Sequence, residues 1–301
     1  MKPSVTTVIP TIGRPSLTRA VHSVLDQTYP VSEIIVVADT DVQVSVPADD
    51  RIVLLRNGVS VGPARCRQLG IDAASGSVIA LLDDDDVWSP SKLARQLAAV
   101  DAVDSDHWIV SSRMLVLGPG NRQRRWPRRL IEPGESVAEY LFRFNGLGFG
   151  DGNLQTSTLC FPTDLGRSVR WGGASDAPHD EPSWLIRVQR TTPDLHVVQL
   201  PEMLSIYNVH DPSVSRDLSD HTDTYIGWGL EYLGRESPRL LGDYLCTSPV
   251  SAAVSAGSLG GLRRAVWSAL RHGRPGPCAL AYAALNAARL VVRRAETSIR
   301  Q

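Results

Sequence analysis

The sequence contains 301 residues, of which 43% are hydrophobic, and its formal net charge is −1 at pH 7. A chain of this length and composition can bury a large core, which excludes wholesale disorder, and its near-neutral charge predicts no nucleic-acid partner. The four cysteines are far apart and form no CxxC pair, so neither a zinc site nor a disulfide framework is predicted, and a reduced, cytoplasmic setting is expected.

The first hundred residues alternate between strand and helix signals. Apolar runs predict strands at residues 6–9, 33–38, 51–55 and 78–82, the first of them stopped by Pro10. Helices are predicted at residues 15–27 and 62–74, and Ser89 and Pro90 are expected to cap and open a third. This alternation predicts an α/β half, residues 1–104, with parallel strands joined by right-handed crossovers.

Four consecutive aspartates, Asp83 to Asp86, follow the fourth predicted strand. Adjacent carboxylates repel one another by about 1 kcal/mol per pair in water, and by more where solvent is scarce. A strand end that crowds them usually recruits a cation, and oxygen ligands suit a hard ion such as Mg²⁺ or Mn²⁺, which often accompanies a substrate diphosphate. A solvated acidic turn is the alternative, but the apolar residues before and after the run favour a cation site.

Ligands of open α/β sheets bind beyond the carboxyl ends of the strands, so Pro10, Thr11, Asp39 and the aspartate run are expected to meet at one rim. Asp39 could accept a hydrogen bond from a uracil-type N3–H or act as a cap, and both interpretations stay open. Arg65, on the following helix, could reach a base or a phosphate, although a surface charge is its simpler explanation.

A nucleotide-sugar at this rim would need help for its leaving group and a base for the acceptor. If the strand persists, Asp83, Asp84 and Asp85 point to alternate faces, so that one reaches the ribose while another holds the metal. Asp180 or Glu181, before a helix predicted at residues 182–189, could serve as the base. Acidic residues also favour helix N-termini for dipole reasons, which is the simpler explanation from position alone.

The middle of the chain, residues 105–218, is less regular and predicts an α+β half. Strands are expected at residues 108–117, 156–161, 196–200 and 204–208, with a mobile glycine-rich loop at 145–153.

Residues 219–301 are predicted to be helical. Residues 278–292 are apolar nearly all round but too few to span a bilayer. They are expected to pack on the body of the protein, on a second subunit of a homodimer, or at a membrane surface beside neighbouring arginines. Packing on the body is the favoured interpretation.

Several segments resemble family 2 glycosyltransferases of the glycosyltransferase-A fold. They match the family in order and spacing and are VIPTIGRP, SVLDQTYPVSEIIVVADT, GPARCRQLGIDAASG, IALLDDDDVWSPSKLARQ, HDEPSWLIR and IYNVHDPSVS. The resemblance covers residues 4–216. It implies a catalytic domain at residues 1–218 with a mixed central sheet, made of a Rossmann-like nucleotide-sugar-binding half (1–104) and an acceptor half (105–218), followed by a C-terminal helical region (219–301).

The resemblance also implies roles for individual residues. Nucleotide-sugar contacts are implied for Pro10, Thr11, Asp39, Arg65, Asp83 and Asp84. Asp85 of the DXD signature is implied as a metal ligand, and His210 matches a family histidine near the diphosphate, although a lone histidine is as often structural. Glu181 falls at the position of the catalytic base, usually an Asp, so the choice between Glu181 and Asp180 stays open. Ala38 also departs from the family, since many members have a second Asp there.

The implied activity is inverting transfer of a sugar from a UDP-, GDP- or dTDP-sugar to a hydroxyl, assisted by Mg²⁺ or Mn²⁺. The acceptor could be a glycan, a lipid-linked glycan or a natural product. High Ala and Arg usage suggests a bacterial protein, cytoplasmic or peripheral at the inner face of the membrane.

Three rival functions compete with this interpretation. Asp83, Asp85 and Val87 satisfy the motif of haloacid-dehalogenase phosphotransferases, with Asp83 as nucleophile, but that family carries the motif on its first strand. A nucleotidyltransferase would need a glycine-rich loop after the first strand, where this chain has only Gly13. A non-catalytic nucleotide-sugar binder is the third alternative.

Overall fold

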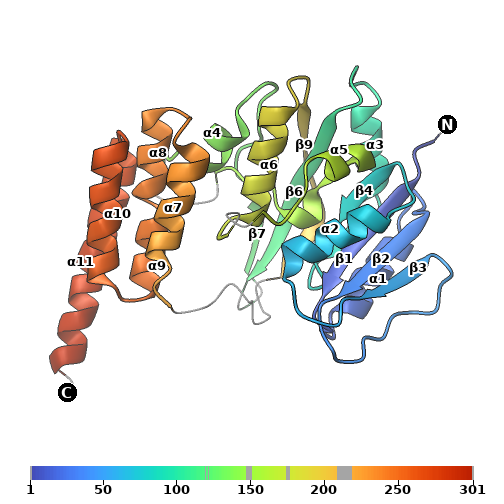
Figure 1. The fold of residues 1–301 in the computed structure, drawn as a ribbon, viewed down its shortest axis with the longest axis horizontal. Coiled ribbons are helices and arrows are strands. Elements are labelled where there is room, and N and C mark those ends of the chain that lie inside the picture. Colours follow the sequence, from blue (N-terminus) through green and yellow to red (C-terminus); the bar gives the residue numbers. More distant parts are fainter. Residues whose placement is uncertain are drawn as a thin grey trace. The chain divides into compact units, whose positions relative to one another are not determined.

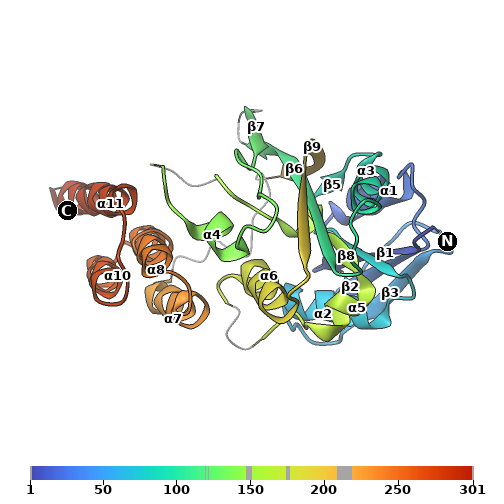
Figure 2. The same ribbon diagram turned by 90° about the horizontal axis from the view of Figure 1, so that it is seen from above.

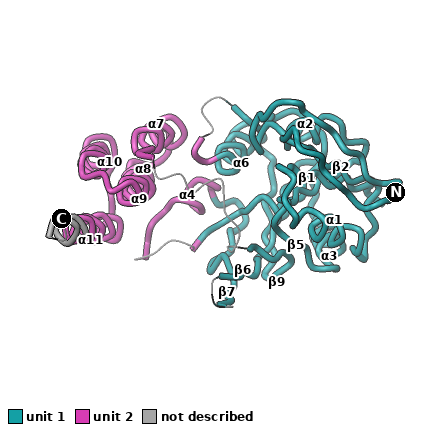
Figure 3. The backbone as a smooth tube through the Cα atoms, turned by 90° about the horizontal axis from the view of Figure 1, so that it is seen from below, with its two compact units in different colours: residues 1–135, 152–173, 180–212 teal, residues 136–151, 174–179, 213–301 magenta. Residues whose placement is uncertain are grey.

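The computed structural model describes residues 2–118, 120, 122–146, 151–173, 177–208 and 219–299, with side chains described as far as residue 292. His210 and residues 147–150 of the expected glycine-rich loop lie outside these ranges. The chain divides into two compact units, unit 1 (residues 1–135, 152–173 and 180–212) and unit 2 (residues 136–151, 174–179 and 213–301), coloured in Figure 3. The domain boundary expected at residue 218 also falls outside the described residues and stays a prediction.

Within the described part of unit 1, nine strands form one sheet in the order β3-β2-β1-β4-β8-β6-β9-β5, with β7 paired to β6 (Figure 1). The parallel strands are β1 (Val5–Thr11), β2 (Glu33–Ala38), β3 (Ile52–Arg56) and β4 (Val78–Leu81). These are the four strands predicted in the first hundred residues, and their parallel arrangement confirms the α/β prediction for this half.

Helices cover both faces of the parallel strands. They are α1 (Leu17–Leu25), α2 (Pro63–Ala73), α3 (Lys92–Val100) and α5 (Thr163–Ser168). Figure 2 shows α1 and α3 on one side of these strands and α2 and α5 on the other. Gly70 of α2 lies so close to β1 that a Cβ there would meet Val8 Cγ1 at 2.3 Å. Coverage on both sides explains why β2 is an almost unbroken apolar run.

The first strand does not stop at Pro10, as predicted, but continues to Thr11. The Val8 carbonyl accepts a hydrogen bond from Leu82 N, so Pro10, two residues later, faces the same neighbour. Since β4 ends at Leu81, no partner is lost when proline offers no N–H there.

The third helix begins later than predicted, at Lys92 with Ser91 as its N-cap residue. Ser89 lies two residues before this cap and instead continues the pairing of the short strand β5 (Val87–Trp88) with β9, through its N–H, which donates to the Leu204 carbonyl at 2.9 Å.

The other strands make the sheet mixed, as the family resemblance implied. They are β6 (Trp108–Gly118), β7 (Arg122–Trp126), β8 (Cys160–Pro162) and β9 (His196–Asn208). Strand β8 runs antiparallel to β4 and β6, whereas β6 and β9 are parallel. The strand predicted at 156–161 is wrong over its first half, where Thr156–Thr158 forms a 3-10 helix, η2, opened by the Gln155 side chain, which accepts from Ser157 N.

Two further predictions differ in length. The strands expected at 196–200 and 204–208 are one strand, β9, which β6 accommodates by register shifts on both sides of Arg113. The helix expected at 182–189 is α6 (Asp180–Thr191), longer by two residues at each end.

Unit 2 is helical, and its C-terminal helices confirm the helical region expected after residue 219. Its helices are α4 (Val137–Phe142), α7 (Thr222–Leu233), α8 (Pro238–Leu245), α9 (Ser248–Ser255), α10 (Leu259–His272) and α11 (Pro277–Ile299). His179 packs here against Phe142, Trp228 and Tyr244, and burial lowers its pKa to about 3. In the described part of the chain, no helix combines the length and apolarity needed to cross a bilayer.

Unit 1 contains a fully buried lysine on α3. Lys92 Nζ donates to Gln96 Oε1 at 2.7 Å and lies 4.0 Å from the centre of the Trp88 ring. Gln96 Nε2 in turn donates to the Thr158 carbonyl at 2.7 Å, so the lysine supports the last residue of η2. Burial disfavours the charged ammonium and lowers the pKa of Lys92 to about 8.

We predict that Lys92→Met removes a pH dependence of stability. The unfolded lysine keeps its proton to about pH 10, whereas Lys92 in the folded protein loses it near pH 8, so the wild-type protein gains stability as pH rises between these values. The unfolding free energies of wild type and variant are measured by denaturant titration at pH 7 and at pH 10. Between these two pH values, the wild-type protein should gain at least about 1 kcal/mol of stability relative to the variant. An identical pH dependence in both proteins would contradict the burial of a charged lysine.

Candidate active site

Three features at the carboxyl ends of the parallel strands meet, as the topology predicts. The backbone N–H of Asp39, after β2, donates to the carbonyl of Thr11, the last residue of β1, at 2.8 Å. Thr11 Oγ1 donates to Asp84 Oδ2, beyond β4, at 2.6 Å. Pro10 is buried in β1 next to this contact. Pro10, Thr11, Asp39 and Asp84, four of the residues expected to bind the nucleotide-sugar, therefore share one rim of the sheet.

The four aspartates form a turn and not a continued strand, so the expected alternation of their side chains is wrong. Asp86 N donates to the Asp83 carbonyl at 3.2 Å, which closes the turn. The strand cannot continue because Asp83 N bonds Ser157 Oγ at 3.0 Å and Val87 has already turned to pair with β9. We call residues 83–86 the acidic turn.

Two arginines hold the acidic turn. Arg14 NH1 contacts Asp84 Oδ1 at 3.1 Å and Asp85 Oδ2 at 2.7 Å, and Arg67 NH2 contacts Asp83 Oδ1 at 2.7 Å. Arg67 is almost completely buried, on the face of α2 that packs inward, and its guanidinium lies over the Trp171 ring. Two guanidinium charges oppose four carboxyl groups, so the turn keeps an excess of negative charge.

The pKa values within the acidic turn reflect burial first and the neighbouring charges second. Burial and then the charge of Asp83 raise the pKa of Asp85 to about 6. Burial also raises the pKa of Asp84, and burial followed by Asp83 raises that of Asp86 well above its ordinary value. Like charges crowded in a partly dry site favour protonation or an added cation.

The donor chemistry of the turn suits a hard cation, but the described residues do not complete its coordination shell. Among them, no group of three His, Cys, Asp or Glu side chains is arranged to hold a metal ion. Asp85 is the aspartate that combines partial exposure, 19% of its side chain, with a strongly raised pKa. Further ligands would have to come from a bound diphosphate, from water or from outside the described ranges, where His210 lies.

Asp39 holds the entry to α2. Its carboxylate accepts from Ser60 Oγ (2.9 Å), Val61 N (2.7 Å) and Gly62 N (2.9 Å), and Gly62 has a φ of 85° that only glycine adopts easily. Burial opposes ionisation of Asp39, but these N–H donors outweigh it and lower its pKa. Arg65 is exposed on the first turn of the same helix. The structure thus gives Asp39 a capping role, which leaves base recognition a proposal.

Glu181 lies on the first turn of α6 and contacts the segment before β8. Its Oε1 accepts from Thr156 N at 2.6 Å and from Thr156 Oγ1. Burial raises the pKa of Glu181, and the positive charge of Arg67 opposes that rise. Burial disfavours the charge of Arg67 itself, but Asp83 and Glu181, followed by Asp180, outweigh burial and raise its pKa. Arg67 therefore stands in the field of both the acidic turn and the candidate bases.

Sequence reasoning missed Arg14, Arg67 and the segment 155–157. A signal for Arg67 was present, because Ala64, Arg67, Gln68 and Ile71 are buried at i, i+3, i+4 and i+7, the spacing of one helix face. Arg65, the residue singled out instead, lies two positions earlier and so points to the other side. The hydrogen bonds from segment 155–157 to three separate acids could not be predicted from the sequence around that segment.

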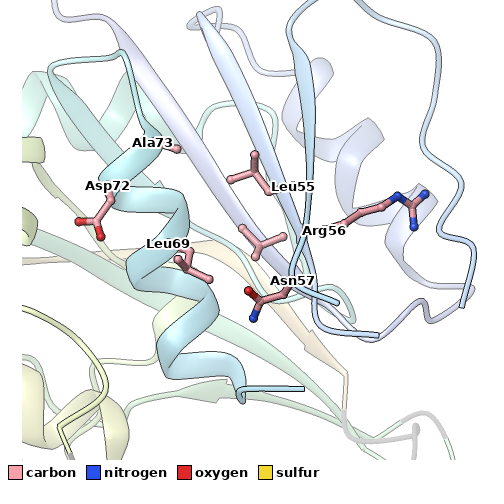
Figure 4. Close-up of a pocket in the computed structure, with 7 residues that line it drawn as sticks. Leu55, Arg56, Asn57, Leu69, Asp72 and Ala73 are labelled. Atoms are coloured by element: carbon pink, nitrogen blue, oxygen red, sulfur yellow. The ribbon is translucent and has the colours of Figure 1, made fainter. Parts of the chain in front are cut away.

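A hollow of about 450 Å³ lies beside this rim, between α2 and the ends of β2 and β3. Figure 4 shows Leu55, Arg56 and Asn57 on one side of it and Leu69, Asp72 and Ala73 of α2 on the other. No residue of the acidic turn lines it, so the candidate site is defined by its acids and not by this hollow.

Comparison with known proteins gives consistent results. The family model of "Glycosyl transferase family 2" matches residues 6–160. The amylovoran biosynthesis glycosyltransferase AmsB of Erwinia amylovora is 25% identical over 227 residues, which are 71% of each chain. The Escherichia coli protein WfgD, named a UDP-Glc:alpha-D-GlcNAc-diphosphoundecaprenol beta-1,3-glucosyltransferase, is 38% identical over 88 residues, 28% of this chain and 35% of its own.

Solved structures of Staphylococcus aureus TarS share the fold. One crystal structure, of TarS residues 1–349, aligns with a TM-score of 0.62 at 13% identity, covering 90% of this chain and 81% of that fragment. A second, in complex with UDP-GlcNAc, aligns with a TM-score of 0.60 at 15% identity, covering 89% and 79%. The likeness confirms the expected glycosyltransferase-A fold. Because the family model matches more than half of the sequence, the chain belongs to glycosyl transferase family 2 and is a glycosyltransferase.

Proposed function

We propose that this protein is an inverting transferase that moves a sugar from a UDP-sugar to an acceptor hydroxyl. The observation that carries the proposal is the position of Arg67, which pairs with Asp83 of the acidic turn and lies in the field of Glu181 and Asp180. The buried guanidinium of Arg67 thus interacts both with an acid on the donor side, Asp83, and with the candidate bases. UDP is favoured over GDP and dTDP because WfgD is named for UDP-Glc and TarS was solved with UDP-GlcNAc and with UDP.

The donor side is assigned to the rim of the sheet. Pro10 and Thr11 would contact the nucleoside, Asp39 would accept from the base, and Arg65 would reach the base or a phosphate. Asp83 and Asp84 would bind the nucleotide-sugar, and Arg14 and Arg67 would keep their carboxylates in place.

The metal is assigned to Asp85, with His210 as a proposed second ligand. Bound there, Mg²⁺ or Mn²⁺ would neutralise charge on the departing diphosphate. Arg14 contributes by holding the Asp85 carboxylate from one side, at 2.7 Å.

Glu181 is the proposed base. Burial raises its pKa toward the neutral range, in which a carboxylate is a more effective proton acceptor. The acceptor hydroxyl would pass its proton to Glu181 while its oxygen forms a bond to the anomeric carbon. The bond to the diphosphate breaks on the opposite side, with its electron pair leaving on UDP, which inverts the anomeric centre. Asp180, one residue earlier on α6, is the alternative base.

Two rivals are less consistent with the structure. In a haloacid-dehalogenase enzyme Asp83 would be a nucleophile on the first strand, whereas here it follows the fourth and is paired with Arg67. A non-catalytic nucleotide-sugar binder would share the rim but would need no base, and the next experiment separates it from an enzyme.

We predict that Glu181→Gln abolishes transfer but not donor binding. Gln keeps a side-chain oxygen for Thr156 and cannot take a proton, so UDP release from UDP-glucose or UDP-GlcNAc should fall by about 10²- to 10⁴-fold. Donor affinity, measured by calorimetry, should stay near wild type. Asp180→Asn is the matched control and should retain turnover. Reversed results would assign the base to Asp180, and full turnover in both variants would contradict the proposal.

We predict opposite effects of Asp85→Asn with and without the donor. Because the folded-state pKa of Asp85 is raised to about 6, its charge destabilises the metal-free protein above that pH and not near pH 4. Metal-free Asp85→Asn should therefore melt at a higher temperature than wild type at pH 8. Addition of Mn²⁺ with UDP should stabilise wild type and leave the variant unchanged. Equal stabilisation of both would remove Asp85 from the metal site.

The membrane contact considered for the C-terminal helices is proposed on the basis of exposed apolar side chains. Trp267 and Leu270 of α10 and Leu285, Val291 and Val292 of α11 are all more than half exposed, so packing within unit 2 covers only part of these helices. Residues 259–301 contain eight arginines and one acidic residue, Glu296. Apolar side chains beside an excess of arginine suit the surface of an anionic membrane.

We predict salt-sensitive binding to anionic vesicles. The protein should sediment with phosphatidylglycerol vesicles and not with phosphatidylcholine vesicles, and Trp267→Ser with Leu270→Ser should weaken sedimentation at least about tenfold. The alternative is that this surface binds a second copy of the chain. In that case the protein would not bind vesicles, and its mass in solution would be that of a dimer in wild type and that of a monomer in the double variant.

A further inference from the structure

A three-residue segment, Gln155 to Ser157, bonds acids on both sides of the site. Toward the acidic turn, Gln155 Nε2 donates to Asp86 Oδ2 at 3.0 Å and to Asp83 Oδ2 at 3.3 Å. Ser157 Oγ donates to Asp86 Oδ2 at 2.6 Å and accepts from Asp83 N at 3.0 Å. The segment thus fixes both the first and the last residue of the turn.

On the other side, the middle residue of the segment holds Glu181. Thr156 offers its backbone N–H and its hydroxyl to the same oxygen, Oε1. Among the described residues, no hydrogen bond reaches Oε2 of Glu181, so this second oxygen is the one available to take a proton. Two donors on one oxygen also set the plane of the carboxylate.

The segment itself is rigidly held. Thr156 and Ser157 are fully buried. The Ser157 carbonyl accepts from Trp88 Nε1 at 2.7 Å and from Ser205 Oγ at 3.0 Å, so β5 and β9 both anchor it. A shift of Ser157 would break four hydrogen bonds at once, which makes independent motion of the two groups of acids costly.

We propose that residues 155–157 form an acid bracket that sets the position of Glu181 relative to the acidic turn, with Thr156 and Ser157 as positioning residues for sugar transfer. The inference rests on the proposed function, because it takes Glu181 as the base and the turn as the donor site. Its physical basis is that an attack along the line of the breaking bond tolerates little displacement: an error of about 1 Å costs on the order of 10²-fold in rate.

The bracket assigns different effects to its two hydroxyls. The Thr156 hydroxyl bonds the base, so Thr156→Val should lower kcat by about 10- to 100-fold with a donor KM within about threefold of wild type. The Ser157 hydroxyl bonds the acidic turn and not the base, so Ser157→Ala should raise the donor KM more than it lowers kcat. Thr156→Ser keeps the hydroxyl and should restore kcat.

A pH profile gives a second readout for Thr156. Removing a donor to a carboxylate disfavours its charged form, so the acidic limb of kcat against pH should move to higher pH in Thr156→Val. The charged and titratable groups that act on Glu181 are Arg67 from α2, Asp83 from the turn and Tyr207 from β9, and none of them is altered in this variant.

Matched controls separate positioning from folding. Thr163→Val removes a buried hydroxyl that bonds the Gly76 carbonyl, and Ser111→Ala removes one that bonds Thr158 Oγ1; neither contacts an acid. Both controls should keep wild-type kcat and pH profile even where they lower Tm.

The outcomes distinguish the two proposals. If Glu181→Gln is inactive while Thr156→Val matches Thr163→Val in kcat, donor KM and pH profile, the bracket is refuted and the proposed function stands. If Glu181→Gln keeps full turnover while Asp180→Asn is inactive, the base is Asp180, the bracket is refuted and sugar transfer still stands. If both variants keep full turnover, both proposals fail. Loss of kcat in Thr156→Val, rescue by Thr156→Ser and a donor-KM effect confined to Ser157→Ala would establish the bracket.

Discussion

The repulsion among four adjacent carboxyl groups at the end of β4 is the constraint on which the site depends. This repulsion is reduced by ion pairs with Arg14 and Arg67 and by hydrogen bonds from the hydroxyl groups of Thr11 and Ser157. Two guanidinium groups do not balance four carboxyl groups, and burial together with the charge of Asp83 raises the pKa of Asp85 to about 6. Residual negative charge in a partly buried turn is costly, and the proposed cation with its diphosphate would offset that cost.

Topology brings the partners of this turn together. Parallel strands end at one edge of the sheet, so Thr11, Asp39 and Asp84 meet although far apart in sequence. The mixed half then adds β8 antiparallel to β4, which places the segment before β8 against the acidic turn. Arg67 connects the acidic turn with the candidate base, because it forms an ion pair with Asp83 and also interacts electrostatically with Glu181.

Local patterns were sufficient for the parallel half of the fold, but not for Arg14, Arg67 or the segment 155–157. Apolar runs located the four parallel strands, and the family resemblance singled out the acids that the structure gathers. Long-range contacts were not predictable in this way. The 3-10 helix at residues 156–158 interrupts a strand-like sequence because Gln155 caps it, and α3 begins after Ser89 because Ser89 still belongs to the pairing of β5 with β9. Arg67 was overlooked because a buried charge is identified by its partners, Asp83 and Glu181, and not by its neighbours in sequence.

Calorimetric titration of the folded protein with UDP, in the presence of Mn²⁺ and again in excess EDTA, tests most directly whether the acidic turn is a cation-dependent diphosphate site. The account predicts saturable binding with Mn²⁺ that weakens at least about tenfold in EDTA, a change of about 1.4 kcal/mol in binding free energy. Equal affinity under the two conditions would contradict it.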